Sequence, residues 1–380
     1  MLIKSATLGL FTKLSQAHQP RLLQNSRKMC SAEPDVIIQD CGDKGLIILN
    51  RPKALNSLNV SMVDKIYPAL KKWESEKKLV IIKGNGGKAF CAGGDVKAIT
   101  EAAFKGNKLG YEFFKKEYTN NGLIGSYKIP YVAFIDGIVM GGGVGLSVHG
   151  PYRIATERSL FAMPETQIGL FPDVGGSHFL PKLTGKLGWY LALTGVRLKG
   201  TDLFKAGIAT HLTDSSNLEK IEKELLKTSN ESEIKSVLNK YHKNDEKREF
   251  SLNPYLGKID ACFSAPTVEE IYLRLEKDGS KWAEETIALL NKMSPTSLKI
   301  TLQQLELGKR MDLHECLKME YRMAVNCVDG HDFREGVRAL LIDKDQSPKW
   351  KPANLKDVTS EIIDKHFRRL PEEMELKHKL

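Results

Sequence analysis

The sequence lacks a long apolar run. No stretch of its 380 residues approaches the roughly 18 consecutive apolar residues that a membrane span needs. Cysteine is also scarce, and the six cysteines form no CxxC pair and have no histidine at ligand spacing. This pattern argues against a disulfide scaffold or a zinc site and is typical of reduced thiols in an intracellular protein. With 41% hydrophobic residues, the chain can bury one large core, or a core plus a helical appendage.

Acidic residues are absent from the first 32 positions. This segment supplies +5 of the formal charge of +10 and leaves +5 for the rest of the chain. Its basic residues are Lys4, Lys13, Arg21, Arg27 and Lys28. Together with its serines and leucines, this composition predicts a mitochondrial transit peptide over residues 1–32, and hence a matrix protein. A disordered basic tail is the alternative, whereas a secretory signal is disfavoured because no uninterrupted apolar segment is present.

The usual signatures of nucleotide binding and of serine hydrolases are missing as well. Residues 145–150 are one position out of step with the G-x-S-x-G nucleophile elbow. Residues 84–88 lack the Walker spacing, and residues 137–143 do not give G-x-G-x-x-G. Three histidines have no obvious acid partner and are interpreted as core or loop residues: His149, His178 and His211.

Strand-like and helix-like segments alternate in the first half of the chain. Short β-rich runs at 36–40 and 45–49 predict a hairpin, and apolar runs at 79–82 and 131–135 predict buried strands. Helices are predicted between them: one capped by Ser61, one at 96–103 and one at 111–118. This alternation indicates an α/β fold.

After about residue 212 amphipathic helical patterns dominate, and no strand-like run of comparable strength occurs. These patterns cover 217–226, 231–241, 267–275, 281–293, 297–307 and 313–325. We therefore predict a core at 33–212, a helical insertion and C-terminal helical region at 213–355, and a tail at 356–380.

The chain is organised around residues 135–176. A strand there runs into the triple glycine Gly141–Gly143, followed by a small-residue helix start, a short strand pair and a loop with Glu165 and Asp173. Glycines at such a turn let backbone N–H groups approach a ligand, and a helix N-terminus adds partial positive charge. A carboxylate among apolar residues tends to have a shifted pKa. Donors for an oxyanion beside carboxylates indicate acyl chemistry.

Five motifs in this chain, in this order, resemble the enoyl-CoA hydratase/isomerase (crotonase) superfamily. They are Leu49–Pro52, Ala89–Asp95, Gly141–Gly143, Pro164–Glu165 and Asp332–Val337. The resemblance covers about residues 35–350 and implies a spiral of ββα units capped by C-terminal helices. It also implies that the backbone N–H groups of Gly94 and Gly142 hold a thioester oxygen. Tight turns alone are the other reason for glycine at these positions.

The departures from the family pattern indicate a branch. Hydratases of the family carry a glutamate two residues after the triple glycine, where this chain has Gly145. The string Met163–Gly176 instead resembles a branch that hydrolyses 3-hydroxyacyl-CoA thioesters. In that branch Glu165 and Asp173 carry out hydrolysis, and Glu117 contacts the substrate. Without the resemblance, Glu117 would be interpreted as part of a solvated helix face.

A carboxylate is expected to do the chemical work, because the chain offers no Ser/His or Cys/His set near the glycines. Glu165 can attack the thioester directly, giving a mixed anhydride that water cleaves, or it can act as general base on water. Two acids with separable roles favour the covalent route, in which Asp173 handles protons.

The same sequence leaves two rival functions open. One is a hydratase or isomerase on this scaffold, which Gly145 disfavours. The other is an RNA-binding relative, disfavoured by the modest charge after residue 32 and the lack of a Lys/Arg-rich run with interleaved aromatics. The expected ligand is thus a small acyl-CoA, with no nucleic acid or membrane partner. No metal or redox cofactor is expected, since CoA arrives with the substrate. A homo-oligomer is compatible with the sequence.

Overall fold

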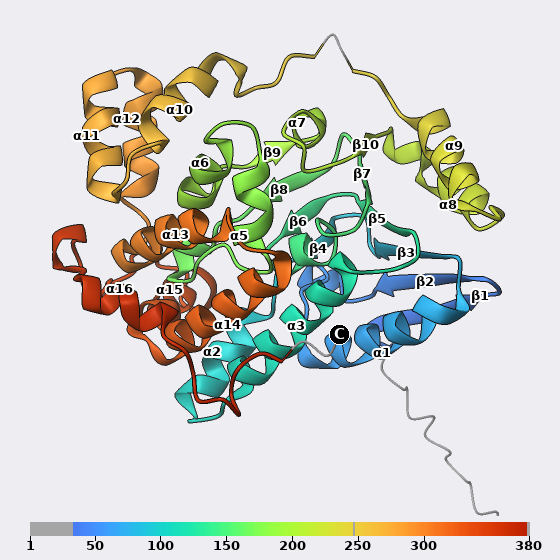
Figure 1. The fold of residues 1–380 in the computed structure, drawn as a ribbon, viewed down its shortest axis with the longest axis horizontal. Coiled ribbons are helices and arrows are strands. Elements are labelled where there is room, and N and C mark those ends of the chain that lie inside the picture. Colours follow the sequence, from blue (N-terminus) through green and yellow to red (C-terminus); the bar gives the residue numbers. More distant parts are fainter. Residues whose placement is uncertain (1–32, 246–247, 378–380) are drawn as a thin grey trace, which may run out of the picture. The chain divides into compact units, whose positions relative to one another are not determined.

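Two β-sheets form the centre of the structure, a computed structural model that describes residues 33–245 and 248–377 (Figure 1). The predicted transit peptide lies outside these residues. Six strands make the first sheet, in the order β1 (Val36–Cys41), β2 (Lys44–Leu49), β3 (Leu79–Gly84), β5 (Tyr131–Ile135), β7 (Tyr152–Ala155) and β10 (His211–Leu212). Four make the second, in the order β4 (Ala89–Ala92), β6 (Ile138–Met140), β8 (Leu160–Ala162) and β9 (Leu198–Lys199).

The chain passes repeatedly from the first sheet to the second. β3, β5 and β7 lie in the first sheet, and the strand that follows each, β4, β6 and β8, lies in the second. The predicted hairpin is confirmed, because β1 and β2 pair antiparallel with Ile38 opposite Ile47. The predicted strand pair after the glycines is wrong: β7 pairs with β5 and β8 with β6, each parallel. Two parallel strands need a long crossover between them, so β7 and β8, which a short turn joins, cannot pair with each other in parallel.

Both faces of the first sheet are covered, which explains the continuous apolar runs in its central strands. In β3 the side chains of Val80 and Ile82 join the main core, while Leu79 and Ile81 point to the opposite face. The opposite face is covered by α8 (Leu218–Leu225) and α9 (Glu231–Tyr241), whose buried leucines and isoleucines complete a second apolar cluster. This helix pair therefore packs on the predicted core rather than among the later helices.

Seven helices occur in the described chain before β10. They are α1 (Val60–Glu76), α2 (Val96–Phe104), α3 (Leu109–Gly125), α4 (Gly142–Gly145), α5 (Gly176–Phe179), α6 (Leu187–Thr194) and α7 (Thr201–Lys205). The predicted Ser61 cap is wrong, since the Asn59 side chain accepts the Met62 N–H at 2.8 Å and starts α1 two residues earlier. The helix then continues through Pro68 and buries the face that contains Ile66 and Leu70.

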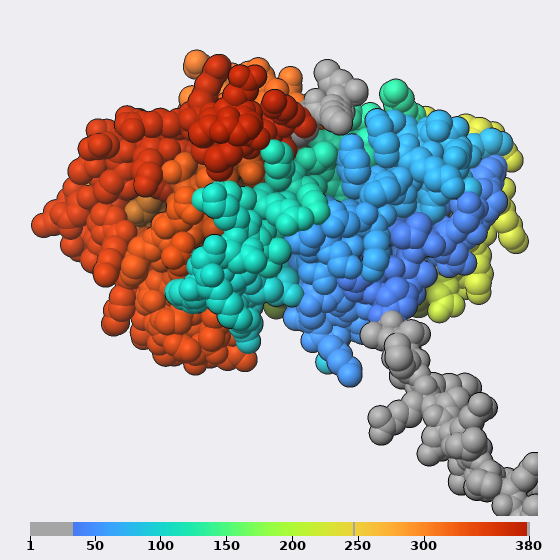
Figure 2. Space-filling view, turned by 90° about the horizontal axis from the view of Figure 1, so that it is seen from below, coloured from blue at the N-terminus to red at the C-terminus, as the bar shows by residue number. Residues whose placement is uncertain are grey.

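The described elements after β10 are all helical. They include α10 (Leu256–Phe263), α11 (Val268–Asp278), α12 (Lys281–Leu290), α13 (Pro295–Gly308), α14 (Leu313–Asp329), α15 (His331–Val337) and α16 (Ser360–Phe367). α14 packs on α3, and α15 packs on α2 and on the 3₁₀ turn Glu165–Ile168. Figure 2 shows the C-terminal segment beside α2 and α3 on one face. The predicted α/β fold with a helical C-terminal region is thus confirmed. No described helix combines the length and apolarity of a bilayer span.

Candidate active site

A cavity of about 410 Å³ lies where β4 and β6 end, beside α3 and the turn after β8. We call it the active-site cavity. All five residues singled out from the sequence line it: Gly94, Glu117, Gly142, Glu165 and Asp173. They come from four segments that are far apart in the sequence. Their convergence is the first evidence that they act together.

One wall of the active-site cavity is made of glycine backbone. β4 and β6 pair parallel with Ala92 opposite Met140, so the glycines that follow the two strands emerge at the same sheet edge. A Cβ atom on Gly141 would lie 3.3 Å from Gly93 Cα, which shows how closely the two segments approach. The N–H groups of Gly94 and Gly142 donate to no acceptor within the described residues. Two free amide donors therefore border the same space.

Glu117 faces this glycine wall from α3. Its side chain is only 2% exposed, so the interpretation as a solvated helix face is excluded. A Cβ atom on Gly142 would lie 2.3 Å from Glu117 Oε1, an oxygen that has no hydrogen-bond partner in the described structure. A buried carboxyl oxygen without a protein partner next to a free N–H is suited to receive a polar ligand group.

Glu165 and Asp173 approach from the segment after β8. Glu165 begins the 3₁₀ turn, and its Oε1 would lie 3.0 Å from a Cβ atom on Gly141. Its other oxygen, Oε2, is buried and has no partner in the described structure. Asp173 Oδ2 accepts a 2.7 Å hydrogen bond from the hydroxyl of Tyr118 on α3. Both acids are buried, so the cavity holds three carboxyl groups away from bulk water.

Burial gives these acids unusual proton affinities. Burial raises the pKa of Asp173 to about 7, and the Tyr118 hydroxyl opposes that rise by hydrogen bonding to the ionised form. Burial, and then the charge of Asp173, holds the pKa of Glu165 well above its usual range. The same two causes, with Glu165 as a third, raise the pKa of Glu117. An acid with the pKa of Asp173 exchanges protons near neutral pH, as general acid–base chemistry requires.

The loop that carries Asp173 is held by residues that sequence reasoning missed. Glu320 on α14 accepts the N–H of Gly175 at 2.7 Å and both the N–H and the hydroxyl of Ser177, at 2.9 and 2.6 Å. The Nε2–H of His149 donates to the carbonyl of Val174 at 2.7 Å. Val174 needs such support, because its φ of 52° is costly for a β-branched residue. One feature of the sequence could have identified Glu320, because it is a glutamate on the apolar face of the helix predicted over 313–325.

The other two predicted lone histidines also have no acid partner in the described structure. The Nζ of Lys182 contacts His178 Nε2 at 2.5 Å, and the hydroxyl of Thr210 contacts His211 Nδ1 at 2.9 Å. Neither histidine lines the active-site cavity. The interpretation of these residues as core or loop histidines is confirmed.

The turn that carries Glu165 rests on α15. A Cβ atom on Gly336 would lie 2.4 Å from the carbonyl carbon of Ile168, so only glycine allows this contact. Ser294 links the two elements, because its N–H donates to the Thr166 carbonyl at 3.1 Å and its hydroxyl donates to Asp332 at 2.6 Å. The C-terminal motif thus supports the turn that carries Glu165.

A model of the enoyl-CoA hydratase/isomerase family matches residues 44–367. The chain belongs to this family. The structure shows what residues of the family's motifs do at their positions in this chain. Arg51, in the first motif, forms a 2.9 Å ion pair with Asp95. Asp95 in turn caps α2 by accepting the Ala98 N–H, and it ends the segment that contains Gly94.

The similar proteins span almost the whole chain. A Homo sapiens protein named "3-hydroxyisobutyryl-CoA hydrolase, mitochondrial" is 57% identical, covering 90% of this chain and 91% of its own length. The Rattus norvegicus protein of the same name is 56% identical, covering 92% and 93%. Among solved structures, a carnitinyl-CoA dehydratase from Mycobacterium thermoresistibile matches with a TM-score of 0.84 and 34% identity, over 91% of this chain and 99% of that one.

Gly145 is the position where this chain departs from the hydratase pattern described above. A Cβ atom there would lie 2.7 Å from Asn121 Nδ2 and 2.7 Å from Val174 Cβ. The space that a glutamate side chain would occupy is therefore filled by Asn121 and Val174. A second glutamate at this position would require the Asp173 loop to move.

Proposed function

We propose that this chain is a mitochondrial enzyme of valine catabolism that hydrolyses the thioester of 3-hydroxyisobutyryl-CoA to 3-hydroxyisobutyrate and free CoA. Its similar proteins carry the name of this hydrolase over about nine-tenths of the chain. The observation that carries the proposal is the active-site cavity, where two free amide donors meet three buried carboxyl groups. Amide donors beside carboxyl groups can support attack on a carbonyl carbon without a Ser/His pair.

The glycine wall would stabilise the transition state. As water or a carboxylate attacks the thioester carbonyl, negative charge develops on its oxygen. The N–H groups of Gly94 and Gly142 are assigned to hold that oxygen, and they are fixed by the sheet edge before substrate binds. Each such donor typically contributes about 10²–10³ in rate.

Glu165 is assigned to the attack and Asp173 to proton transfer. In one route ionised Glu165 attacks the carbonyl, the thiolate leaves, and water cleaves the resulting anhydride. In the other, Glu165 takes a proton from the attacking water, and its raised pKa makes it a stronger base. Single turnover in ¹⁸O-water places label in Glu165 when water attacks the enzyme's side of an anhydride, and hydroxylamine trapping detects the anhydride if water attacks the acyl side. Absence of both signals would support the general-base route.

The 3-hydroxyl of the substrate is assigned to Glu117 or Asp173. These acids are buried polar groups of a cavity whose lining also includes the apolar side chains of Phe113, Phe114 and Leu170. An analogue without the hydroxyl leaves such a group unpaired, so it should be rejected. We expect isobutyryl-CoA to be hydrolysed far more slowly than 3-hydroxyisobutyryl-CoA. Equal kcat/KM values for the two would contradict this assignment.

Thiol release from a panel of acyl-CoAs tests the function directly. The hydrolase should release free CoA from 3-hydroxyacyl thioesters and should not hydrate crotonyl-CoA, because Asn121 and Val174 occupy the place of the second glutamate. Rapid crotonyl-CoA hydration without thiol release would establish the rival hydratase activity. Salt-sensitive retention on RNA, with neither reaction, would establish the binding protein.

The proposed reaction needs no metal or redox cofactor, since the carboxyl groups and amide donors supply the chemistry. Activity should therefore survive dialysis against a chelator, and its loss with recovery on adding a metal would refute this point. The proposal also places the mature enzyme in the matrix after removal of its leader. N-terminal sequencing of mitochondrial protein should begin near residues 30–33, whereas recovery of an intact Met1 would refute cleavage.

A further inference from the structure

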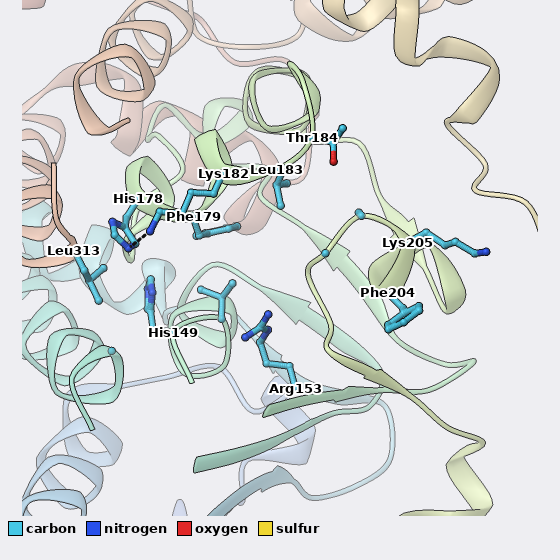
Figure 3. A pocket seen from close by; sticks show the side chains of 14 residues that line it. His149, Arg153, His178, Phe179, Lys182, Leu183, Thr184, Phe204, Lys205 and Leu313 are labelled. Carbon is cyan, nitrogen blue, oxygen red and sulfur yellow. Dashed lines mark hydrogen bonds between the residues drawn. The ribbon is translucent and has the colours of Figure 1, made fainter. Parts of the chain in front are cut away.

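A second cavity, of about 460 Å³, lies behind the loop that carries Asp173 (Figure 3). We call it the basic pocket. His149 forms part of its wall and also donates to the Val174 carbonyl, so a single residue connects this pocket with the Asp173 loop. No lining residue is shared with the active-site cavity. The hydrolase mechanism therefore leaves the basic pocket without a role.

The basic pocket contains cations and no carboxylates. Arg153, Lys182 and Lys205 line it, and no Asp or Glu does. Figure 3 shows the Arg153 guanidinium and the His149 ring directed into one gap, with Lys182 turned toward His178 beside it and Lys205 pointing away. Net positive charge in a recess of this size favours an anionic occupant.

Arg153 is the most unusual of these cations. Its Nε and Nη1 donate to the carbonyls of Ile208 and Gly150, each at 2.7 Å, and it forms no ion pair with the described residues. Burial lowers the pKa of Arg153 to about 10, with no carboxylate near enough to offset that effect. Some other arginines of this chain have acid partners, such as Arg51 with Asp95 and Arg322 with Glu375. A partly buried guanidinium whose Nη2 has no hydrogen-bond partner in the described structure is suited to bind an anion from outside the protein.

Lys182 supplies a second charge to the lining of the basic pocket, with its ammonium group turned toward His178. Its only hydrogen-bond partner in the described structure is His178 Nε2, at 2.5 Å, and this contact leaves two ammonium hydrogens free. Burial and the nearby Lys182 charge lower the pKa of His178, so the ring is neutral and accepts this bond. Two cations that line one pocket match a dianion better than a monoanion.

Apolar side chains complete the recess. Phe179, Leu183 and Phe204 lie beside the cations. We propose that the basic pocket binds a small organic phosphate monoester, with its phosphate between Arg153 and Lys182 and its apolar body against Phe179. Inorganic phosphate shares the charged contacts but lacks the apolar ones, so it should bind more weakly than an aryl ester.

Calorimetric titration of the full-length protein with phenyl phosphate tests this site without any substrate, so its failure leaves the proposed hydrolase activity unaffected. We expect saturable binding at one site per chain that weakens as salt is added. Lys182→Met should weaken binding about tenfold, as for loss of one charge-assisted contact. Arg153→Lys, which keeps the charge but not the planar fork, should also weaken it.

Lys199→Met is the matched control, because Lys199 is exposed on β9 and does not line the basic pocket. It makes the same change in net charge and should leave phenyl phosphate affinity unchanged. Phenol should not saturate the site, and inorganic phosphate should bind more weakly than phenyl phosphate. Absence of saturable binding at low salt, or equal losses in Lys182→Met and Lys199→Met, would overturn the proposal.

Discussion

The active-site cavity and the basic pocket gather ionisable groups of opposite type, buried acids in the first and bases in the second, on neighbouring sides of one loop. The first holds Glu117, Glu165 and Asp173 with no ion-pair partner in the described structure, and the second holds Arg153 and Lys182 in the same condition. Buried charges without partners cost stability, so a fold retains them where they meet something from outside the protein. The comparison of the two cavities indicates that ionisable groups without ion-pair partners distinguish a candidate site from a packing defect better than cavity volume does.

The support for the two recesses differs. Glu117 lies on α3 and Glu165 on a turn supported by α15, whereas the loop that carries Asp173 is held by one hydrogen bond from His149 and three to Glu320. Substitution of the acids should therefore change the chemical step, whereas substitution of the residues that hold the loop should change the position of Asp173. The following predictions separate these effects, from the largest to the smallest.

Glu165→Gln should have the largest effect. It removes the attacking or basic oxygen in either route, so kcat should fall by about 10³-fold or more with little change in KM. The pKa of Glu165 is raised in the folded state, so its ionisation opposes folding as pH rises through that pKa. Tm at alkaline pH should then rise rather than fall in the variant. Steady-state kinetics and thermal melts give both readouts.

Glu372→Gln is the control for this change, because Glu372 is exposed in the C-terminal segment. Its kcat and Tm should equal those of the parent protein. If Glu165→Gln retained near-parental kcat, the assignment of this residue would be wrong under both routes.

Gly142→Ala tests the opposite wall and should have the next largest effect. The new Cβ atom would lie 2.3 Å from Glu117 Oε1 and would displace either that acid or the amide donor. Loss of one oxyanion donor should lower kcat by about 10²-fold. Gly257→Ala, in α10, has no atom within 4 Å of the added Cβ and should leave kcat unchanged. Equal kcat values for the two variants would exclude Gly142 from the oxyanion hole.

The sequence predicted the acids and glycines better than the elements that hold them. Apolar periodicity identified α9 and β5 with their observed bounds, because burial on a fixed face dictates residue type. It did not reveal that β7 and β8 enter different sheets, since which strands pair depends on contacts far along the chain. Gly94 and Gly142 were identified through family motifs, whereas periodicity alone left open whether they served only tight turns.

Tyr118, His149 and Glu320 were missed for a shared reason. Each acts by one hydrogen bond or a few to a loop that is distant in the sequence, and such a bond leaves no local pattern. Arg153 was likewise invisible, because a basic residue in a strand has no unusual spacing. Arg153 is distinguished only in the folded structure, where no carboxylate lines the pocket around it.

His149→Phe should have a moderate effect, because it breaks the connection between the two recesses. The ring volume is roughly kept, but the Val174 carbonyl loses its 2.7 Å hydrogen bond and the strained loop can relax. As a positioning residue, His149 should affect kcat about tenfold while KM changes less. His211→Phe is the control, since the His211 side chain hydrogen-bonds Thr210 and Asn239 and does not line the active-site cavity. Similar kinetics for both variants would mean that His149 does not position Asp173.

Tyr118→Phe should give the smallest and most specific effect, a shift along the pH axis. The Tyr118 hydroxyl donates to Asp173 Oδ2 and favours its ionised form, opposing the rise that burial causes. In the parent enzyme, activity that needs ionised Asp173 should fall as pH drops below about 7. Removing the hydroxyl raises the pKa of Asp173 further, so the rising limb of kcat should move to higher pH by about one unit. The plateau at alkaline pH should stay near the parental value.

Tyr131→Phe is the matched control for this shift. Tyr131 is equally buried, but its hydroxyl donates to the backbone carbonyl of Leu146 at 2.9 Å and touches no acid of the active-site cavity. Any loss from the missing buried hydrogen bond should then appear as lower stability without a shift in the pH–rate profile. A rising limb that moves equally in both variants, or in neither, would show that ionisation of Asp173 does not control turnover. A shift confined to Tyr118→Phe would assign the limb to Asp173, because only that variant changes the hydrogen bonding of this carboxyl group.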